Sequence, residues 1–422
     1  MPLYIANIKR IESIKAEKLI ARVLGILFSH ATISPCLSLT ISPRLFCRSL
    51  LSRRGVCCAV ICCSILNVIL LGWAMLRIQN VLLNPGLNCG FDHDFLPGGM
   101  TVVLGRNQAG KTNLCRLIAG LSTQAVGELS LNNTPLNKLS PQKRAVAVVF
   151  QAFVNYPNWS VQQNIASPMV AAGKDRAYIQ GRVVELAEKI GLGELLQRMP
   201  NELSGGQQQR LAIARALAKE AQVLLLDEPL VNLDYKLREA LALELRSLLD
   251  DSDTTVIYTT TDPKDAFTLG DDLLLLDGGG KLQAGAPLSV YQKPNTFAAA
   301  NLMSDPGINT FAWSTLTDQA FAQQCQAASD VSLLGGVRPE HLFFVDKSEF
   351  NATECVGFDL QVSALETSGD ETFVHGLVQA SNHGLVDQPA WVVRSPGMLN
   401  FSQGQELLVA ARKRDILAFG GQ

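Results

Sequence analysis

The chain has 422 residues, with 36 basic and 38 acidic side chains and a formal net charge of −2 at pH 7. This length allows two or three domains with a substantial core, and the balanced charge without a long basic run argues against a nucleic-acid partner. Six of the ten cysteines precede residue 75, and the other four lack metal-ligand or disulfide-like spacing, which indicates a reducing, cytosolic environment.

The first 74 residues differ in character from the rest of the chain. Residues 1–54 are basic and irregular, and residues 55–76 form an uncharged apolar run that is long enough for a membrane span or an uncleaved signal. Because arginines concentrate before this run, the positive-inside tendency would carry the rest of the chain out of the cytosol. An opening strand is predicted from Met75. We therefore interpret residues 1–74 as upstream sequence outside the working protein, with a membrane anchor as the alternative.

Residues 100–104 are predicted to form a buried strand, followed by a glycine-rich loop and a helix that ends at Gly120. The loop has the spacing Gly-x-x-x-x-Gly-Lys-Thr of a P-loop, in which backbone N–H groups and a helix N-terminus face a polyphosphate. In such a loop Lys111 places its charge on the β and γ oxygens, and the Thr112 hydroxyl ligates Mg²⁺. A surface glycine turn is the alternative, but the flanking strand and helix favour phosphate binding. The predicted nucleotide-binding residues are Gly105, Arg106, Asn107, Gln108, Ala109, Gly110, Lys111, Thr112 and Asn113.

Strands are also predicted on both sides of the P-loop unit. Residues 81–94 are expected to form a hairpin. Phe91 and Phe95 are the aromatic residues available in this region before the P-loop, as candidates for adenine stacking or for core packing. Residues 145–150 form a second buried strand that ends in Gln151. A polar amide at the carboxyl end of a parallel strand is placed to reach the metal and the attacking water, although an ordinary loop glutamine is the alternative.

The pattern becomes helical over residues 152–201, which we interpret as an inserted subdomain. Its Tyr156 and Trp159 are candidates to anchor a partner helix, with core packing as the alternative. Leu203–Gln207 then leads into a helix-forming run at residues 208–217. Its serine and two glycines offer backbone donors at a helix start, but they cannot easily reach the ligand of the chain's own P-loop. We therefore expect them to serve a nucleotide held by another subunit.

An apolar strand at residues 223–226 ends in two carboxylates, Asp227 and Glu228. Asp227 is predicted to hold Mg²⁺ through water, and Glu228 to polarise the attacking water as general base. Asn232–Asp234 is a predicted subunit-contact loop. The next predicted elements are a helix near residues 236–250 and a strand at residues 254–258.

These motifs, in this order behind a P-loop, resemble the ATP-binding subunits of ABC transporters. The likeness covers residues 75 to about 300, and Leu203–Gln207 is a signature nearly private to that superfamily. It implies an α/β P-loop ATPase domain at 75–304 with a helical subdomain at 152–201. It also implies that the partner-facing ATP contacts come from Ser204, Gly205, Gly206, Gln207 and Asp234.

The remaining residues resemble the branch that serves sugar and polyol importers. Gly336–His341 looks like the start of that branch's accessory β domain, so residues 305–422 are predicted to form an all-β, OB-like (TOBE-type) domain. Five further segments are similar to one ATPase subunit of bacterial glycerol-uptake importers, which carry two different ATPase subunits. These segments are 153–157, 164–169, 172–176, 232–238 and 258–263.

The departure from the family lies at Thr261. ABC ATPases normally have a histidine after the last core strand, where it contacts the γ-phosphate and holds the attacking water with the glutamate. No histidine lies between Asp94 and Glu340 in this chain. A threonine hydroxyl can form a hydrogen bond but cannot carry charge, so Thr261 is a candidate catalytic position with altered chemistry.

The resemblance implies ATP and Mg²⁺ as cofactors. The implied partners are two permease subunits, a second ABC ATPase and, indirectly, a periplasmic solute-binding protein, with this chain peripheral on the cytoplasmic face of the bacterial inner membrane. We expect an asymmetric heterodimer that energises import of a carbohydrate or polyol, with glycerol favoured. The alternatives are a hydrolysis-impaired regulatory or scaffold subunit, a sugar-importer ATPase that acts as a homodimer, and a soluble ABC-type translation or repair factor.

Overall fold

The computed structural model describes residues 75–84, 90–122, 126–231, 235–250, 253–313, 316, 321, 334–378 and 390–419. The segment interpreted as upstream sequence and the predicted subunit-contact loop Asn232–Asp234 lie outside these residues. Within the described ranges, no helix combines the length and the apolar character needed to cross a bilayer.

A six-stranded sheet forms the centre of the ATPase region, in the order β10-β9-β3-β8-β7-β6. Its inner strands are buried on both faces, which explains why they read as continuous apolar runs in the sequence. All neighbours are parallel except β10, which runs antiparallel to β9. The strands are β3 (Met100–Leu104), β6 (Val146–Val149), β7 (Val223–Asp227), β8 (Thr255–Thr260), β9 (Asp272–Asp277) and β10 (Gly280–Gly285).

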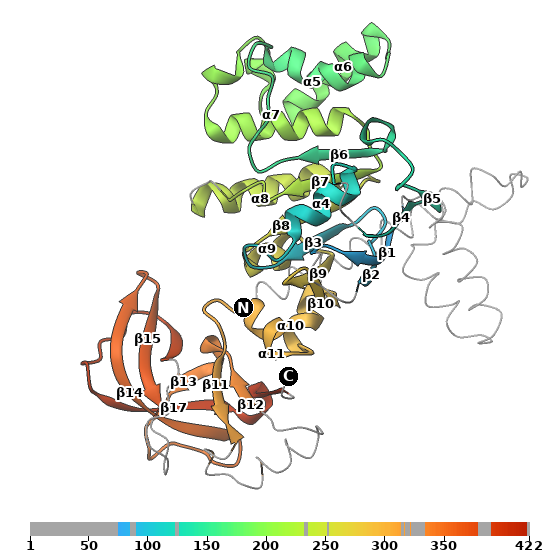
Figure 1. The fold of residues 1–422 in the computed structure, drawn as a ribbon. Coiled ribbons are helices and arrows are strands. Elements are labelled where there is room, and N and C mark those ends of the chain that lie inside the picture. The colour runs from blue at the N-terminus through green and yellow to red at the C-terminus, as the bar shows by residue number, and fades with distance from the viewer. Residues whose placement is uncertain are drawn as a thin grey trace, which may run out of the picture. The chain divides into compact units, whose positions relative to one another are not determined.

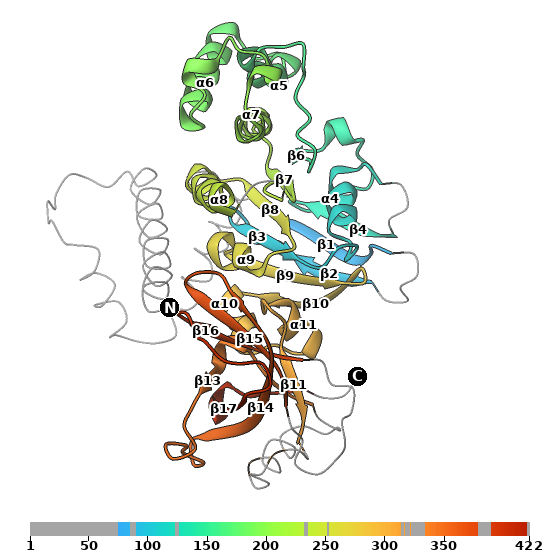
Figure 2. The ribbon, with the colours of Figure 1, turned by 90° about the vertical axis from the view of Figure 1, so that its left-hand side faces the viewer.

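Helices cover both faces of this sheet (Figure 2). Helices α8 (Tyr235–Asp250) and α9 (Pro263–Leu269) pack on one face, against side chains such as Val102 and Leu226. Helix α4 (Lys111–Ala119) packs on the other face, against Val103 and Leu225. The predicted helix end at Gly120 is confirmed, since this residue is the C-cap with φ 79° and its N–H bonds back to the last turn.

A second, four-stranded antiparallel sheet has the order β2-β1-β4-β5. It contains the predicted opening strand and first hairpin, β1 (Leu76–Leu82) and β2 (Phe91–Asp94), together with β4 (Val126–Leu131) and β5 (Thr134–Pro135). Phe95 is 1 % exposed and belongs to the core beneath this sheet, and Phe91 packs against the same core. Core packing therefore accounts for both rings.

Helices α5 (Val161–Ala171), α6 (Arg176–Lys189) and α7 (Gly205–Ala218) form a bundle with its own core (Figure 1). Each helix has a side-chain N-cap, from Ser160, Asp175 and Ser204 respectively. Short 3₁₀ turns lie at Pro141–Lys143, Gly193–Leu195, Pro200–Glu202, Pro339–His341 and Lys413–Asp415.

Helices α10 (Pro287–Gln292) and α11 (Phe297–Leu302) lead into an all-antiparallel β region. This region is nearly barrel-shaped and OB-like, as predicted, around a core of aliphatic and aromatic side chains that includes Phe311, Trp313 and Trp391. The domain boundary after residue 304 stays a prediction. One sheet has the order β11-β12-β18 and the other β13-β17-β14-β15-β16. Their strands are β11 (Asn309–Ala312), β12 (Leu334–Val337), β13 (Leu342–Phe344), β14 (Cys355–Thr367), β15 (Glu371–Val378), β16 (Trp391–Pro396), β17 (Glu406–Arg412) and β18 (Leu417–Phe419).

Candidate nucleotide site

The predicted P-loop joins β3 to α4 and needs both of its glycines. A Cβ atom on Gly105 would lie 2.7 Å from the Leu276 carbonyl oxygen, and Gly110 has the left-handed φ of 99°. Gly110 is also the N-cap of α4, and it supplies no side-chain oxygen to the N–H groups of the first turn. Residues 106–108 are exposed and Ala109 is buried. The loop therefore presents backbone donors and a helix N-terminus, the arrangement that binds phosphate.

Lys111 is the buried cation of this loop, with 4 % of its side chain exposed. Its Nζ donates to the carbonyl oxygens of Gly105 at 2.8 Å and Arg106 at 2.9 Å. The same nitrogen lies 3.0 Å from Glu228 Oε1. The structure thus brings together a P-loop lysine and a carboxylate from the end of β7.

Asp227 lies beside Thr112, the residue that follows Lys111. The Thr112 hydroxyl donates to Asp227 Oδ1 at 3.1 Å, and the Thr259 hydroxyl donates to the same oxygen at 3.0 Å. Burial raises the pKa of Asp227, and these two hydroxyl donors oppose that rise by stabilising the carboxylate. Carboxylate and hydroxyl oxygens are hard ligands of the kind Mg²⁺ takes, with the remaining positions filled by water and substrate phosphates.

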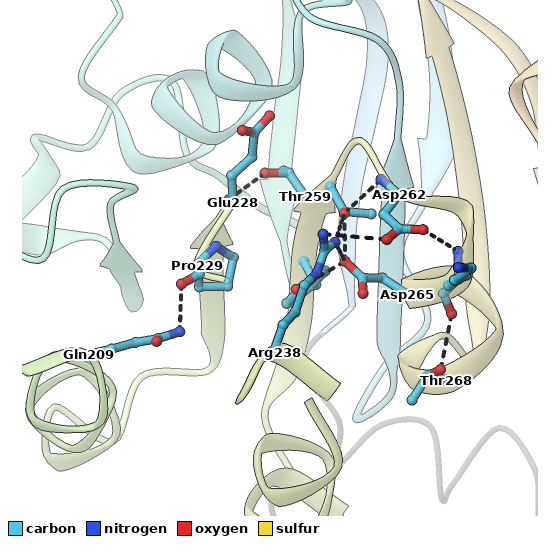
Figure 3. Close-up of polar contacts among 11 residues, drawn as sticks. Gln209, Glu228, Pro229, Arg238, Thr259, Asp262, Asp265 and Thr268 are labelled. Atoms are coloured by element: carbon cyan, nitrogen blue, oxygen red, sulfur yellow. Dashed lines mark hydrogen bonds and ion pairs between the residues drawn. The ribbon is translucent and has the colours of Figure 1, made fainter. Parts of the chain in front are cut away.

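Thr259 is a site residue that sequence reasoning missed. Its hydroxyl accepts from the backbone N–H of Glu228 at 2.9 Å (Figure 3). The same hydroxyl donates to Asp227, so one side chain fixes both acidic residues. Glu228 has a φ of 47°, which is uncommon for a residue with a side chain. The pairing of neighbouring strands could have identified Thr259, because it lies opposite Asp227 in the parallel strands β8 and β7.

Thr261 follows the end of β8 and is exposed. It lines one small pocket together with Glu228, so the structure places two of the three predicted catalytic positions near each other; the third, Gln151, does not line this pocket. The neighbours of Thr261 are held firmly: the Thr260 hydroxyl donates to Asp265 at 2.6 Å and accepts from the Asp262 N–H at 3.0 Å.

The sequence comparisons agree with this geometry. The family model described as ABC transporter matches residues 90–231. The chain is 36% identical over 338 residues to the sn-glycerol-3-phosphate import ATP-binding protein UgpC of Rhodopseudomonas palustris strain BisB18, covering 78% of this chain and 92% of the relative. The chain belongs to the ABC transporter family.

Two further comparisons concern this ABC ATPase. The UgpC protein of Cereibacter sphaeroides is 36% identical over 327 residues, covering 76% of this chain and 89% of the relative. Among solved structures, cbiO1 from Clostridium perfringens, part of the ABC transporter complex cbiONQ, is 24% identical with a TM-score of 0.49. That likeness covers 52% of this chain and 92% of the other.

The ABC signature begins α7 of the bundle. Ser204 Oγ accepts from the Gln207 N–H at 3.4 Å, and Gln207 Oε1 accepts from the Ser204 N–H at 2.9 Å, which is a capping box. A Cβ atom on Gly205 would meet open space. Within the described part of the chain, no hydrogen bond or ion pair joins Ser204–Gln207 to the P-loop. Gln151 is exposed just beyond β6, and Asp234 lies outside the described residues.

A groove of about 460 Å³ lies between the bundle and the sheet of this ABC ATPase. Tyr156 and Trp159 line it, with 46 % and 43 % of their surfaces exposed, so the core alternative for these two rings is wrong. Their ring centroids lie 4.6 Å apart, and the Arg215 guanidinium lies 4.7 Å from the Tyr156 ring. We call this surface the aromatic groove.

Proposed function

We propose that this ABC ATPase hydrolyses Mg²⁺-ATP to energise a bacterial importer for a polyol-class solute. The observation that carries the proposal is the cluster of Lys111, Thr112, Asp227 and Glu228, whose contacts place a phosphate-binding cation beside two carboxylates. The relatives are named for sn-glycerol-3-phosphate import, and the five similar segments favour glycerol. A glycerol skeleton is common to both solutes.

The residues have distinct proposed tasks. The backbone of 105–113 and Lys111 bind the phosphates, whereas Thr112, Gln151 and Asp227 hold Mg²⁺, which would neutralise charge on the phosphates. Glu228 polarises the attacking water, since its carboxylate is held near the P-loop and keeps some exposure. Ser204–Gln207 and Asp234 complete the ATP site of a second ATPase subunit.

We propose further that the two ATP sites of the assembly are unequal. Each ATP lies between the P-loop of one subunit and the signature of the other. The site built on Lys111 and Glu228 has Thr261 where a chargeable histidine is usual, and therefore hydrolyses slowly. The intact Ser204–Gln207 segment supports faster hydrolysis in the partner's site.

The aromatic groove is the proposed docking site of a permease helix. Its two exposed rings offer an apolar surface, and Arg215 and Lys219 add positive charge, which suits an amphipathic helix that carries acidic residues. Docking there holds the ATPase at the cytoplasmic face of the membrane. ATP-driven closure of the two ATPase subunits then moves the docked helices, and hydrolysis reopens the pair.

Co-purification from the native host tests this proposal. The chain is expressed from Met75 with an affinity tag, purified in mild detergent, and its bound subunits are identified with their stoichiometry. We expect two permease subunits and, in equal amount, a second ATPase that carries the missing histidine. Recovery without permeases would contradict the importer function. Two copies of this chain beside the permeases would contradict only the heterodimer.

One observation favours a second candidate, an ATP-binding scaffold that never turns over at its own site. That observation is Thr261, whereas the paired carboxylates Asp227 and Glu228 favour hydrolysis. Substitution of Glu228 by Gln separates the two when the partner's site is obstructed by Ser204→Arg. The remaining turnover is then abolished if this chain's own site hydrolyses ATP, and is unchanged if the chain is a scaffold.

A further inference from the structure

Gln209 connects the signature helix to the segment that carries the proposed general base. It lies in the first half of α7, is 1 % exposed, and its Nε2 donates to the Pro229 carbonyl oxygen at 2.5 Å (Figure 3). Pro229 follows Glu228 directly in the chain. We propose that Gln209 is a positioning residue through which movement of α7 adjusts the Glu228 carboxylate; this inference rests on the proposed function.

The backbone of Glu228 is unusually sensitive to such a movement. Its φ of 47° is retained by the hydrogen bond from its N–H to the Thr259 hydroxyl on one side. On the C-terminal side of Glu228, the ring of Pro229 fixes the φ of Pro229. Few freely rotating backbone dihedrals therefore separate the Pro229 carbonyl from Glu228. A displacement of the carbonyl is therefore passed to the Glu228 backbone rather than absorbed locally.

Apart from Gln209, the residues within α7 that contact the sheet core are apolar. Ala212, Ile213 and Ala216 pack there, and such burial is non-directional and tolerates sliding, whereas Lys219 at the C-cap donates to the Val146 carbonyl oxygen at the far end of the helix. The Gln209 hydrogen bond is directional and buried. The same side chain leaves its Oε1 atom buried without a hydrogen-bond partner among the described residues. A contact that served packing alone would avoid the free-energy cost of this unpaired oxygen.

Helix α7 carries three functional surfaces in one rigid element. Ser204 lies five residues before Gln209, about 7 Å along a helix, and Arg215 of the aromatic groove lies six residues after it. A permease helix seated in the groove, or a nucleotide of the partner subunit at the signature, can thus shift Gln209. Its bond to Pro229 would transmit that shift to Glu228.

The test uses the whole importer in lipid, with the partner's site obstructed by Ser204→Arg so that the remaining ATP turnover belongs to the site built on Glu228. This turnover is measured with and without solute-loaded binding protein, and the ratio found with Gln209 intact in this background is called the wild-type ratio. Gln209→Leu keeps the side-chain volume and removes the donor. We expect the stimulation ratio to fall about fivefold, the worth of one net hydrogen bond, while the KM for ATP stays within about twofold. Gln208→Leu is the matched control and should keep the wild-type ratio, because Gln208 bonds only to Leu203 of its own bundle through its side chain.

Gln209→Glu is a second variant, and a purely structural role of Gln209 would not give it the pH dependence described next. A buried carboxyl has a raised pKa, and once protonated it can donate to the Pro229 carbonyl. Stimulation in this variant should recover as pH is lowered from about 8 to about 6, relative to wild type. A wild-type ratio in Gln209→Leu, or a pH-independent defect in Gln209→Glu, would overturn the inference. Lack of stimulation in the wild-type importer would instead contradict the proposed function.

Discussion

Lys111 Nζ lies 3.0 Å from Glu228 Oε1, so the P-loop cation and the proposed general base neutralise one another within the chain. Lys111 also donates to two carbonyl oxygens of its own loop. The β and γ phosphates of ATP must compete with all three partners for this nitrogen. ATP binding would therefore draw Lys111 away and release the Glu228 carboxylate toward water.

Substitution of Glu228 by Gln removes a charged competitor for Lys111. We expect ATP to bind several-fold more tightly, corresponding to about 1 kcal/mol, because a hydrogen bond to a charged group exceeds one to a neutral amide. Titration with a fluorescent ATP analogue measures the affinity. Glu188→Gln, an exposed change on α6, is the control with unchanged affinity. Weaker binding in Glu228→Gln would show that the ion pair does not compete with ATP.

Restoring a histidine at Thr261 should raise turnover at the Lys111 site. An imidazole can hold charge near the γ-phosphate, and with the partner's site obstructed by Ser204→Arg we expect about a tenfold gain in the remaining turnover. With both sites open, the total turnover should rise by at most about twofold. Thr261→Val is the comparison, because it removes the hydroxyl without adding a chargeable group. Unchanged turnover in Thr261→His would mean that a different element limits hydrolysis.

Arg238 stabilises the segment on both sides of Thr261. Its Nη2 lies 2.6 Å from Asp265 Oδ2, and its Nη1 lies 3.4 Å from Asp262 (Figure 3). Asp265 is only 5 % exposed, so Arg238→Met would leave a buried carboxylate without its cation. We expect the free energy of unfolding to fall by about 3 kcal/mol, as measured by urea denaturation. The double variant Arg238→Met with Asp265→Leu should recover much of this loss; equal losses in both would assign the effect to packing.

His93 gives the fold a specific pH dependence. Burial, assisted by the positive charge of Lys281, lowers the pKa of His93 to about 4, and Asp272 at 3.6 Å is too distant for a full hydrogen bond. Between about pH 4 and 6.5 the unfolded chain therefore binds more protons, so stability declines as pH falls through this range. We expect wild type to lose about 2.4 kcal/mol more than His93→Gln between pH 7 and pH 4.5. Parallel denaturation profiles would contradict this.

Local patterns carried much of the fold and the site. Three of these patterns are local, because each involves only a few consecutive residues. They are the P-loop spacing, the apolar strand before Asp227 and the serine at the helix start, Ser204, and their structural consequences could be predicted. The all-β character of the region after α11 was predicted from the resemblance of Gly336–His341 to the accessory β domain of sugar and polyol importers.

Contacts between distant residues could not be predicted at this level. Thr259 contacts both acidic residues only because β8 lies next to β7 in the sheet. The sequence of neither strand specifies which strand lies beside it. Gln209 and Arg238 similarly reach partners 20 and 27 residues away through helix packing. Their role depends on tertiary geometry, which propensity and periodicity do not specify.

The most direct test of the asymmetric account compares two variants of this chain in the purified importer by steady-state Mg²⁺-ATP hydrolysis. Ser204→Arg obstructs the partner's site, and Glu228→Gln disables the chain's own site. We predict that Ser204→Arg lowers turnover by at least about tenfold, because the faster site loses its phosphate donors, whereas Glu228→Gln retains most of the activity. Equal and nearly complete losses in both variants would contradict the claim that the two sites are unequal.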